Sequence, residues 1–174
     1  MFETPAEVAQ LQTLLDASLP RSTQHLRNIV KPERSMTAEQ LVTVLTGMRT
    51  LSVATVTAKG EPRISGLDGH FLHARWHFST SEKAAKVGHL RRRPAVSVAH
   101  IVGDDLGVFC HGTVEFLERD HPDFDALHDH LVQHYGSDPD SWQEDPIAYL
   151  RVQPSWMVGY AHDPAGITAQ AATG

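Results

Sequence analysis

Apolar residues recur at helical spacing over the first fifty residues of the chain. In the first run they fall on one helical face: Val8, Leu11, Leu14 and Leu15. Thr4, Pro5 and Glu7 precede this run as a capping box, with proline at the first helical residue, where a helix tolerates it. A second capping box, Thr37 with Gln40, opens another helical run. Its predicted apolar face comprises Leu41, Val44, Leu45 and Met48.

The pattern then changes to that of β-strands. Two runs rich in β-branched residues flank a turn at residues 58–60, which is typical of a hairpin. The segment 71–80 alternates apolar and polar residues and predicts one further strand, with Trp76 and Phe78 on the same side. Residues 95–102 and 106–117 flank a glycine-led turn, so they predict a second hairpin.

A helix is predicted near residues 121–135, followed by a proline-punctuated loop and closing strands up to Tyr160. The tail from Ala161 is rich in glycine and alanine, and we expect it to be loose. Antiparallel strands in sequence, with helices at the ends and one inserted between strands, indicate an α+β fold built on a small closed barrel. Side chains fill the interior of such a barrel, so a ligand is expected outside it or between two copies.

No repeat and no long linker divides the chain, which suggests a single domain. Within it we expect an N-terminal helical extension (1–50), a barrel that binds the ligand (51–160) and a loose tail (161–174).

Composition narrows the class of protein. The chain has 174 residues, of which 41% are hydrophobic and 21% charged, as in ordinary globular proteins. Its formal net charge of -6 argues against a nucleic-acid or acidic-membrane partner. The lone Cys110 excludes an intrachain disulfide and a cysteine-based zinc site, and it suits a reducing compartment. No signal peptide or membrane-spanning run is readable, so we expect no membrane association and a cytoplasmic location.

The segment 78–94 concentrates hydroxyls and cations. Ser79, Thr80 and Ser81 end a strand, and Ser81 is predicted to cap a helix over 82–92. The first N–H groups of a helix have no intrahelical partner and bind phosphate readily. Because helical side chains lean towards the N-terminus, Lys86 can place its ammonium beside these hydroxyls.

Arg63, on the preceding hairpin strand, can offer a bidentate contact to the same anion. From spacing alone a simpler interpretation is favoured, in which Ser81 caps a helix and Lys86 is solvated. In that interpretation residues 91–93 are the solvated last turn of the helix, complementing its dipole.

The order of elements and the residues just named resemble the pyridoxamine 5'-phosphate oxidase-like split β-barrel superfamily of flavin and deazaflavin oxidoreductases. The resemblance covers roughly residues 40–160 and is most specific from Thr80 to Pro94, with Lys86 and Leu90 in register. It implies an obligate homodimer with two sites for FMN or coenzyme F420 between the subunits. The cofactor-binding residues expected from the pattern and the resemblance are Arg63, Ser65, Gly66, Ser79, Thr80, Ser81, Lys86 and Trp156.

Departures from the pattern of the oxidases refine the implied function. Asp68 stands where a basic residue ends the Arg63 strand, and Ala84-Ala85 stands where Ser-Arg precedes the lysine. The basic C-terminal substrate motif is absent, which argues against oxidation of pyridoxamine phosphate. The resemblance is closest to the F420-using branch. It implies hydride transfer between F420 or FMN and a small conjugated substrate. The alternative is a non-catalytic FMN- or haem-binding protein of the same fold.

Backbone N–H groups around Ser65 and Gly66 are expected to polarise the pyrimidine edge of the ring. Glycine permits that close approach, although a turn or bulge explains it too. Trp156 and Tyr160 are candidates to close the site from the partner subunit, against the commoner role of packing. The apolar run from Trp156 to Val158 is expected to be covered by that partner. No catalytic residue is predicted, because no nucleophile with its base is readable.

Twelve histidines raise the hypothesis of a metal site. His130 and His134 share a helical face, with His128 nearby, and His70, His73 and His77 lie on or beside one strand. No HExxH pattern accompanies them, so structural or solvated roles are favoured and no metal is predicted. Haem ligated by histidine stays open as a minority alternative.

Overall fold

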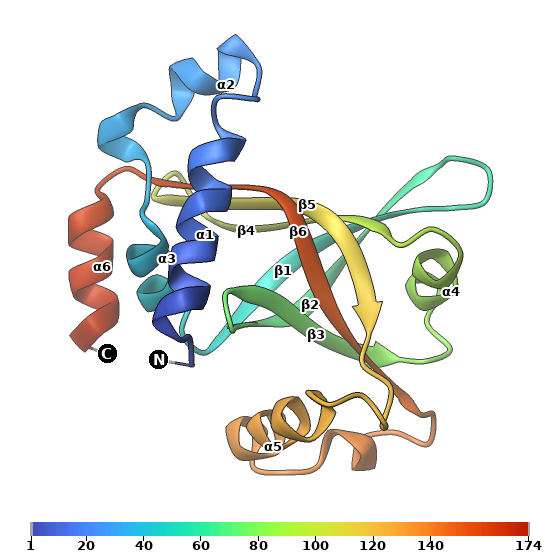
Figure 1. Ribbon diagram of the computed structural model, residues 1–174. Helices are drawn as coiled ribbons and strands as arrows, with labels where there is room; N and C mark the ends of the chain where they lie inside the picture. Colours follow the sequence, from blue (N-terminus) through green and yellow to red (C-terminus); the bar gives the residue numbers. More distant parts are fainter. Residues whose placement is uncertain (1, 174) are drawn as a thin grey trace.

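The computed structural model describes residues 2–173 (Figure 1). In this part of the chain, antiparallel strands close a barrel in the order β1-β2-β3-β6-β5-β4. The strands are β1 (Met48–Val56), β2 (Pro62–Leu72), β3 (Arg75–Ser81), β4 (Ala95–Val102), β5 (Leu106–Phe116) and β6 (Ile147–Ala161). The α+β barrel predicted from the sequence is confirmed.

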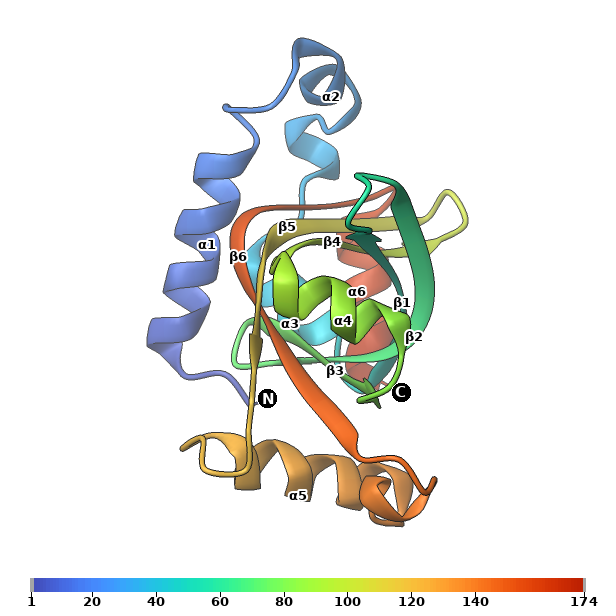
Figure 2. The same cartoon turned by 90° about the vertical axis from the view of Figure 1, so that its right-hand side faces the viewer.

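Helices surround the barrel on three sides (Figures 1 and 2). They are α1 (Pro5–Ser18), α2 (Gln24–Ile29), α3 (Ala38–Val44), α4 (Ala85–Arg92), α5 (Phe124–Tyr135) and α6 (Pro164–Thr173), with short 3₁₀ turns η1 (Pro32–Arg34) and η2 (Pro139–Ser141). The helix α1 runs along β6, and α3 packs against α6. No helix within residues 2–173 combines the length and the apolar character needed to cross a membrane.

Both predicted capping boxes are confirmed. The Thr4 and Thr37 hydroxyls accept from the backbone N–H groups of Glu7 and Gln40, whose side chains accept in return from the cap residues. The helix predicted to follow Thr37, α3, ends at Val44 and is shorter than expected. Gly47 has a φ of 80°, in the left-handed region, and Met48 begins β1 instead of extending the helical face.

The segment 71–80 is not the single strand that its alternation predicts. His73 and Ala74, with φ of 52° and 59°, form a two-residue turn between β2 and β3, and Leu72 pairs with Arg75 across it. Such turns normally contain Asn-Gly or Asp-Gly, whereas the two turn positions here are His73 and Ala74. Trp76 and Phe78 lie on the same side of β3, as predicted, and both are buried in the core.

The tail that the sequence predicts to be loose forms α6 instead. The Asp163 carboxylate accepts from the Gly166 N–H at 3.0 Å and fixes the first turn. Ile167 and Ala171 then pack against the core beside α3. The closing strands are one long strand, β6, with a register shift opposite His111 and Gly112.

Side chains fill the interior of the barrel, as predicted. The fully buried ones include Leu51, Trp76, Phe78, Leu150 and Met157. The helix α4 covers one end of the barrel and adds Val87 and Leu90, each 1% exposed, to the same core (Figure 2). The position of α4 therefore depends on the apolar side chains of its inner face.

We predict that Leu90→Ala lowers the free energy of unfolding by about 2–5 kcal/mol, because it removes a fully buried side chain and leaves a cavity. Arg92→Ala is the matched control on the same helix. The Arg92 guanidinium contacts the Gly88 carbonyl at the surface, so its loss is expected to change stability by less than about 0.5 kcal/mol. Chemical denaturation followed by circular dichroism measures both, and similar losses would show that α4 is not anchored through Leu90.

Candidate functional site

The barrel is split between β2 and β3. Register pairs join β2 to β1 from Pro62 to His70, but they join β2 to β3 only from Gly69 to Leu72. The first part of β2 and residues 79–81 of β3 therefore each have one edge that pairs with no strand of the described chain. Backbone N–H and C=O groups on such edges are available to a ligand.

The helix α4 begins beside the end of β3, and Lys86 is its second residue. The Lys86 ammonium donates to the Thr80 hydroxyl at 3.4 Å. Lys86 is half-buried, and no carboxylate within residues 2–173 pairs with it. Ala84 occupies the N-cap position without a side-chain hydrogen bond, so the first N–H groups of α4 have no side-chain cap. An ammonium, a hydroxyl and a helix start thus lie together, which suits an anion.

Ser81 is not the N-cap that the sequence predicts. It is the last residue of β3, and its hydroxyl accepts from the Lys83 N–H at 3.2 Å. The Ala84 N–H donates to the Ser81 carbonyl at 2.9 Å, which completes a turn before the helix. Serine readily forms such a local turn, and the turn delays the helix to Ala85. Ser79 and Thr80 are half-buried on the same strand end.

Arg63 lies near α4 but does not contact Lys86. It pairs in register with Thr55, whose hydroxyl is 3.1 Å from the ring of His89 on α4. The Arg63 guanidinium instead donates to Glu61 at 2.9 Å and to the Pro62 carbonyl. The backbone of Arg63 therefore lies close to α4, whereas the exposed Arg63 side chain points to the hairpin turn.

Ser65 and Gly66 both lie on the unpaired edge of β2. The register with β1 runs without interruption through both residues, so Gly66 marks neither a turn nor a bulge. A Cβ added at Gly66 would meet no atom within 4 Å, which leaves the backbone approachable from outside. At Gly69, by contrast, an added Cβ would lie 2.3 Å from the Leu51 side chain, so that glycine serves packing.

Trp156 is not brought near Lys86 within one subunit. It lies opposite His111 on β5, eight residues along β6 from Ala148, which is the register partner of Thr80. Its indole N–H donates to the Ser18 carbonyl at 3.0 Å, and its ring stacks on His111. The expectation that the run from Trp156 to Val158 needs a partner is wrong. Met157 and Val158 are buried within the subunit, and the Trp156 indole N–H is bonded to the Ser18 carbonyl at the end of α1 and to the Ser22 hydroxyl.

A chain of hydrogen bonds links α5 to the end of the β2 edge. The buried ring of His70 lies 3.1 Å from the His130 ring nitrogen and 3.1 Å from the Tyr135 hydroxyl, which donates to Asp68 at 3.3 Å. Burial, helped by His130 and His134, lowers the pKa of His70 to about 4. Burial and the Asp68 carboxylate raise the pKa of Tyr135 to about 12. Both groups are therefore neutral near pH 7.

The helical spacing of His130 and His134 predicts that they share a face. The alternating pattern near His70 indicates that this residue lies on or beside a strand. What the sequence does not reveal is that these elements meet, because the two contacts span 60 and 65 residues. His128 belongs elsewhere, 3.0 Å from Asp138 and near Asp140. Arg119 and Tyr149 already bind the Asp140 carboxylate, so this trio resembles an ion-pair network more than a metal site.

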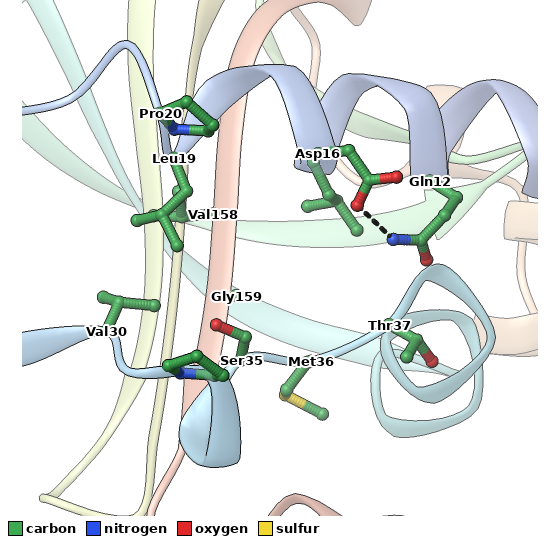
Figure 3. A pocket seen from close by; sticks show the side chains of 12 residues that line it. Gln12, Asp16, Leu19, Pro20, Val30, Ser35, Met36, Thr37, Val158 and Gly159 are labelled. Atoms are coloured by element: carbon green, nitrogen blue, oxygen red, sulfur yellow. Dashed lines mark hydrogen bonds between the residues drawn. The ribbon is translucent and has the colours of Figure 1, made fainter. Parts of the chain in front are cut away.

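A pocket of about 430 Å³ lies between α1, the segment around Pro32 and β6 (Figure 3). Its walls are largely apolar, and on its rim Gln12 donates to Asp16 at 2.8 Å. None of the predicted cofactor-binding residues lines it. The candidate site is therefore the open one at the split of the barrel.

Three solved structures illustrate what the fold resembles. A conserved hypothetical protein from Mycobacterium tuberculosis is 20% identical, with a TM-score of 0.65 over 78% of this chain and 91% of that one. An F420 reductase is 21% identical, with a TM-score of 0.52 over 66% and 93%. A haem storage protein from Vibrio cholerae is 21% identical, with a TM-score of 0.52 over 61% and 81%. These similarities show the fold alone.

No curated protein matches the chain. The family model for pyridoxamine 5'-phosphate oxidase matches residues 37–159, which includes every strand of the barrel except the last two residues of β6. The chain therefore belongs to the pyridoxamine 5'-phosphate oxidase family.

Proposed function

We propose that the protein is an oxidoreductase that binds coenzyme F420 or FMN at the split of the barrel and reduces a small conjugated substrate. The observation that carries this proposal is the half-buried Lys86 ammonium, which meets the Thr80 hydroxyl above the uncapped start of α4. A phosphate there gains a charge-assisted contact, a hydroxyl and helix N–H groups together.

Other residues of the site would complete the binding. The Ser79 side chain points to the face of β3 opposite that of Thr80, so Ser79 would contribute through its backbone on the unpaired edge. Arg63 would reach the anion by exchanging its exposed contact with Glu61. The unpaired backbone at Ser65 and Gly66 would hold the polar edge of the ring. When bound, the ring supplies the hydride chemistry, and the protein contributes orientation and shielding.

We infer a homodimer from the outer face of β1, β2 and β4. Ile64 is 72% exposed and Ile101 is 56% exposed. In register, Ile64 aligns with Ala54, and Ala54 with Ser97, so Val56 and Ile101 share the face of Ile64. Exposed apolar side chains on one sheet face favour burial against another molecule. This face adjoins the unpaired edge of β2, so a second subunit there would enclose the cofactor. In this arrangement the Trp156 that closes the site would come from the second subunit.

The alternative is a non-catalytic FMN- or haem-binding protein, to which the solved haem storage protein lends support. Buried His70 is already bonded through both ring nitrogens, so it is not free to ligate iron. This favours the flavin or deazaflavin among the ligands. Anaerobic assay with reduced F420 and, separately, with FMN and a reductant distinguishes an enzyme from a carrier.

Lys86→Ala is predicted to weaken binding of F420 or FMN by roughly one to two decades in the dissociation constant, because it removes a charge-assisted contact from a partly desolvated site. Lys83→Ala is the matched control. Lys83 is 74% exposed on its side chain and pairs with Asp145 at 2.5 Å, away from Thr80. Fluorescence titration should show at least about a fivefold larger loss for Lys86→Ala than for Lys83→Ala, and the difference should shrink as salt rises. Equal losses would indicate a diffuse basic patch instead of a defined site.

Ile64→Asp is predicted to shift the protein towards a monomer of 19.2 kDa, because it places a charge in an apolar contact between subunits. Ile29→Asp, a change at another exposed isoleucine on α2, should leave the dimer intact. Light scattering over a concentration series measures the shift, and cofactor affinity should fall with the dimer. A wild-type protein that is monomeric at micromolar concentration would refute the site between subunits.

A further inference from the structure

A second cavity, of about 560 Å³, lies where α5, the start of α1, β6 and the turn between β2 and β3 meet. Leu72 and Leu127 form an apolar part of its wall, and Arg75 and His77 of β3 are among its polar residues. Arg75 and Thr80 lie at opposite ends of β3, about 16 Å apart along the strand. This cavity is therefore separate from the proposed cofactor site.

Most of the charged groups around the cavity already have partners. The Glu7 carboxylate lies 3.1 Å from the His73 ring, and Asp123 accepts from Arg151 at 2.6 Å. The Glu115 carboxylate, behind the wall, accepts from the same Arg151 at 2.9 Å. The two acidic residues that line the cavity, Glu7 and Asp123, therefore each have a bonding partner.

The Arg75 guanidinium differs from its neighbours. Among the described residues its guanidinium has no hydrogen-bond or ion-pair partner, although Arg75 is half-buried and lines the cavity. A guanidinium presents a rigid fork of donors that matches a carboxylate in two parallel hydrogen bonds. Arg75 therefore offers the cavity an unpaired cation of defined geometry.

His77 supplies a second, independent group. It is 4% exposed, and its Nδ1 lies 3.2 Å from the Arg75 carbonyl. A carbonyl only accepts, so Nδ1 carries the proton and Nε2 is an acceptor. Burial, helped by Arg151, lowers the pKa of His77 to about 3, so the ring is neutral near pH 7. No described protein group bonds to Nε2, and no fully buried side-chain atom lacks a partner, so Nε2 meets the cavity.

We propose that this cavity binds a small carboxylate that carries a hydroxyl or N–H donor beside the carboxylate and a compact apolar body. Arg75 and His77 are two residues apart, on the same face of β3 and about 7 Å from each other along the strand. The carboxylate pairs with the guanidinium, and the neighbouring donor bonds to His77 Nε2. The apolar body packs against Leu72 and Leu127. The cavity volume suits a ligand of this size.

Three probes test this arrangement by calorimetry on the full chain. Mandelate carries the carboxylate, the α-hydroxyl and an apolar ring, whereas phenylacetate lacks the hydroxyl and methyl mandelate lacks the charge. We expect mandelate to bind with a dissociation constant below about 1 mM, phenylacetate several-fold more weakly and methyl mandelate most weakly. Absence of saturable mandelate binding, or equal binding of the three probes, would overturn the proposal.

Two arginine variants locate the site. Arg75→Gln should weaken mandelate binding at least about tenfold, whereas Arg92→Gln, which removes the same charge from the surface of α4, should leave it unchanged. Equal losses in the two variants would refute the assignment to this cavity. Titration with F420 or FMN should be unaffected by Arg75→Gln, so the outcome is independent of the proposed function.

His77→Phe tests the second contact. If the variant folds, as judged by its thermal transition, mandelate and phenylacetate should bind it equally. The mandelate hydroxyl then has no acceptor, and phenylacetate has no hydroxyl. A persistent preference for mandelate would exclude His77 as the acceptor. If the variant does not fold, the comparison of the two probes on the wild-type protein still decides whether the hydroxyl is recognised.

Discussion

The limited pairing between β2 and β3 is the constraint on which the rest of the structure depends. The two strands are joined only from Gly69 to Leu72, and beyond that point each has an unpaired edge. The helix α4 follows directly from β3 and closes the open end of the barrel through Val87 and Leu90. Because these side chains face inwards, Lys86 is turned towards the strand end, where it meets Thr80. The separation of β2 from β3 therefore determines both where α4 packs and where the candidate site lies.

The two ends of β3 provide different electrostatic surroundings. At the end near α4, the Lys86 cation is balanced by no described carboxylate. Around the middle, buried Arg151 is balanced by Glu115 and Asp123, which stabilises the charge without leaving any for a ligand. At the turn, Arg75 again has no described partner. The paired charges around Arg151 thus lie between the unpaired cations Lys86 and Arg75. In the two proposals, each of these cations binds a different anion at its own end of β3.

The features that sequence reasoning predicted correctly are local ones. The two capping boxes, the hairpin turns and the reach of Lys86 to Thr80 depend on residues within a few positions of each other. The sequence does not predict the turn at His73 and Ala74, because a two-residue hairpin turn requires left-handed conformations that neither residue type favours. The Ser81 cap failed because a local turn competed with the helix. The links of His70 to α5 and of Trp156 to α1 depend on distant contacts, which spacing in one sequence does not encode.

Asp68 shows how a departure from the family pattern acquires a physical meaning. An isolated acidic substitution would only remove a positive charge from the end of the β2 edge. Here the carboxylate accepts from Tyr135, whose hydroxyl in turn lies against the buried ring of His70. A lysine at this position has no acceptor to offer the Tyr135 hydroxyl, so this chain of hydrogen bonds requires an acceptor such as a carboxylate at position 68. A carboxylate held there repels a phosphate. This repulsion supports the expectation from the sequence that the protein does not oxidise pyridoxamine phosphate.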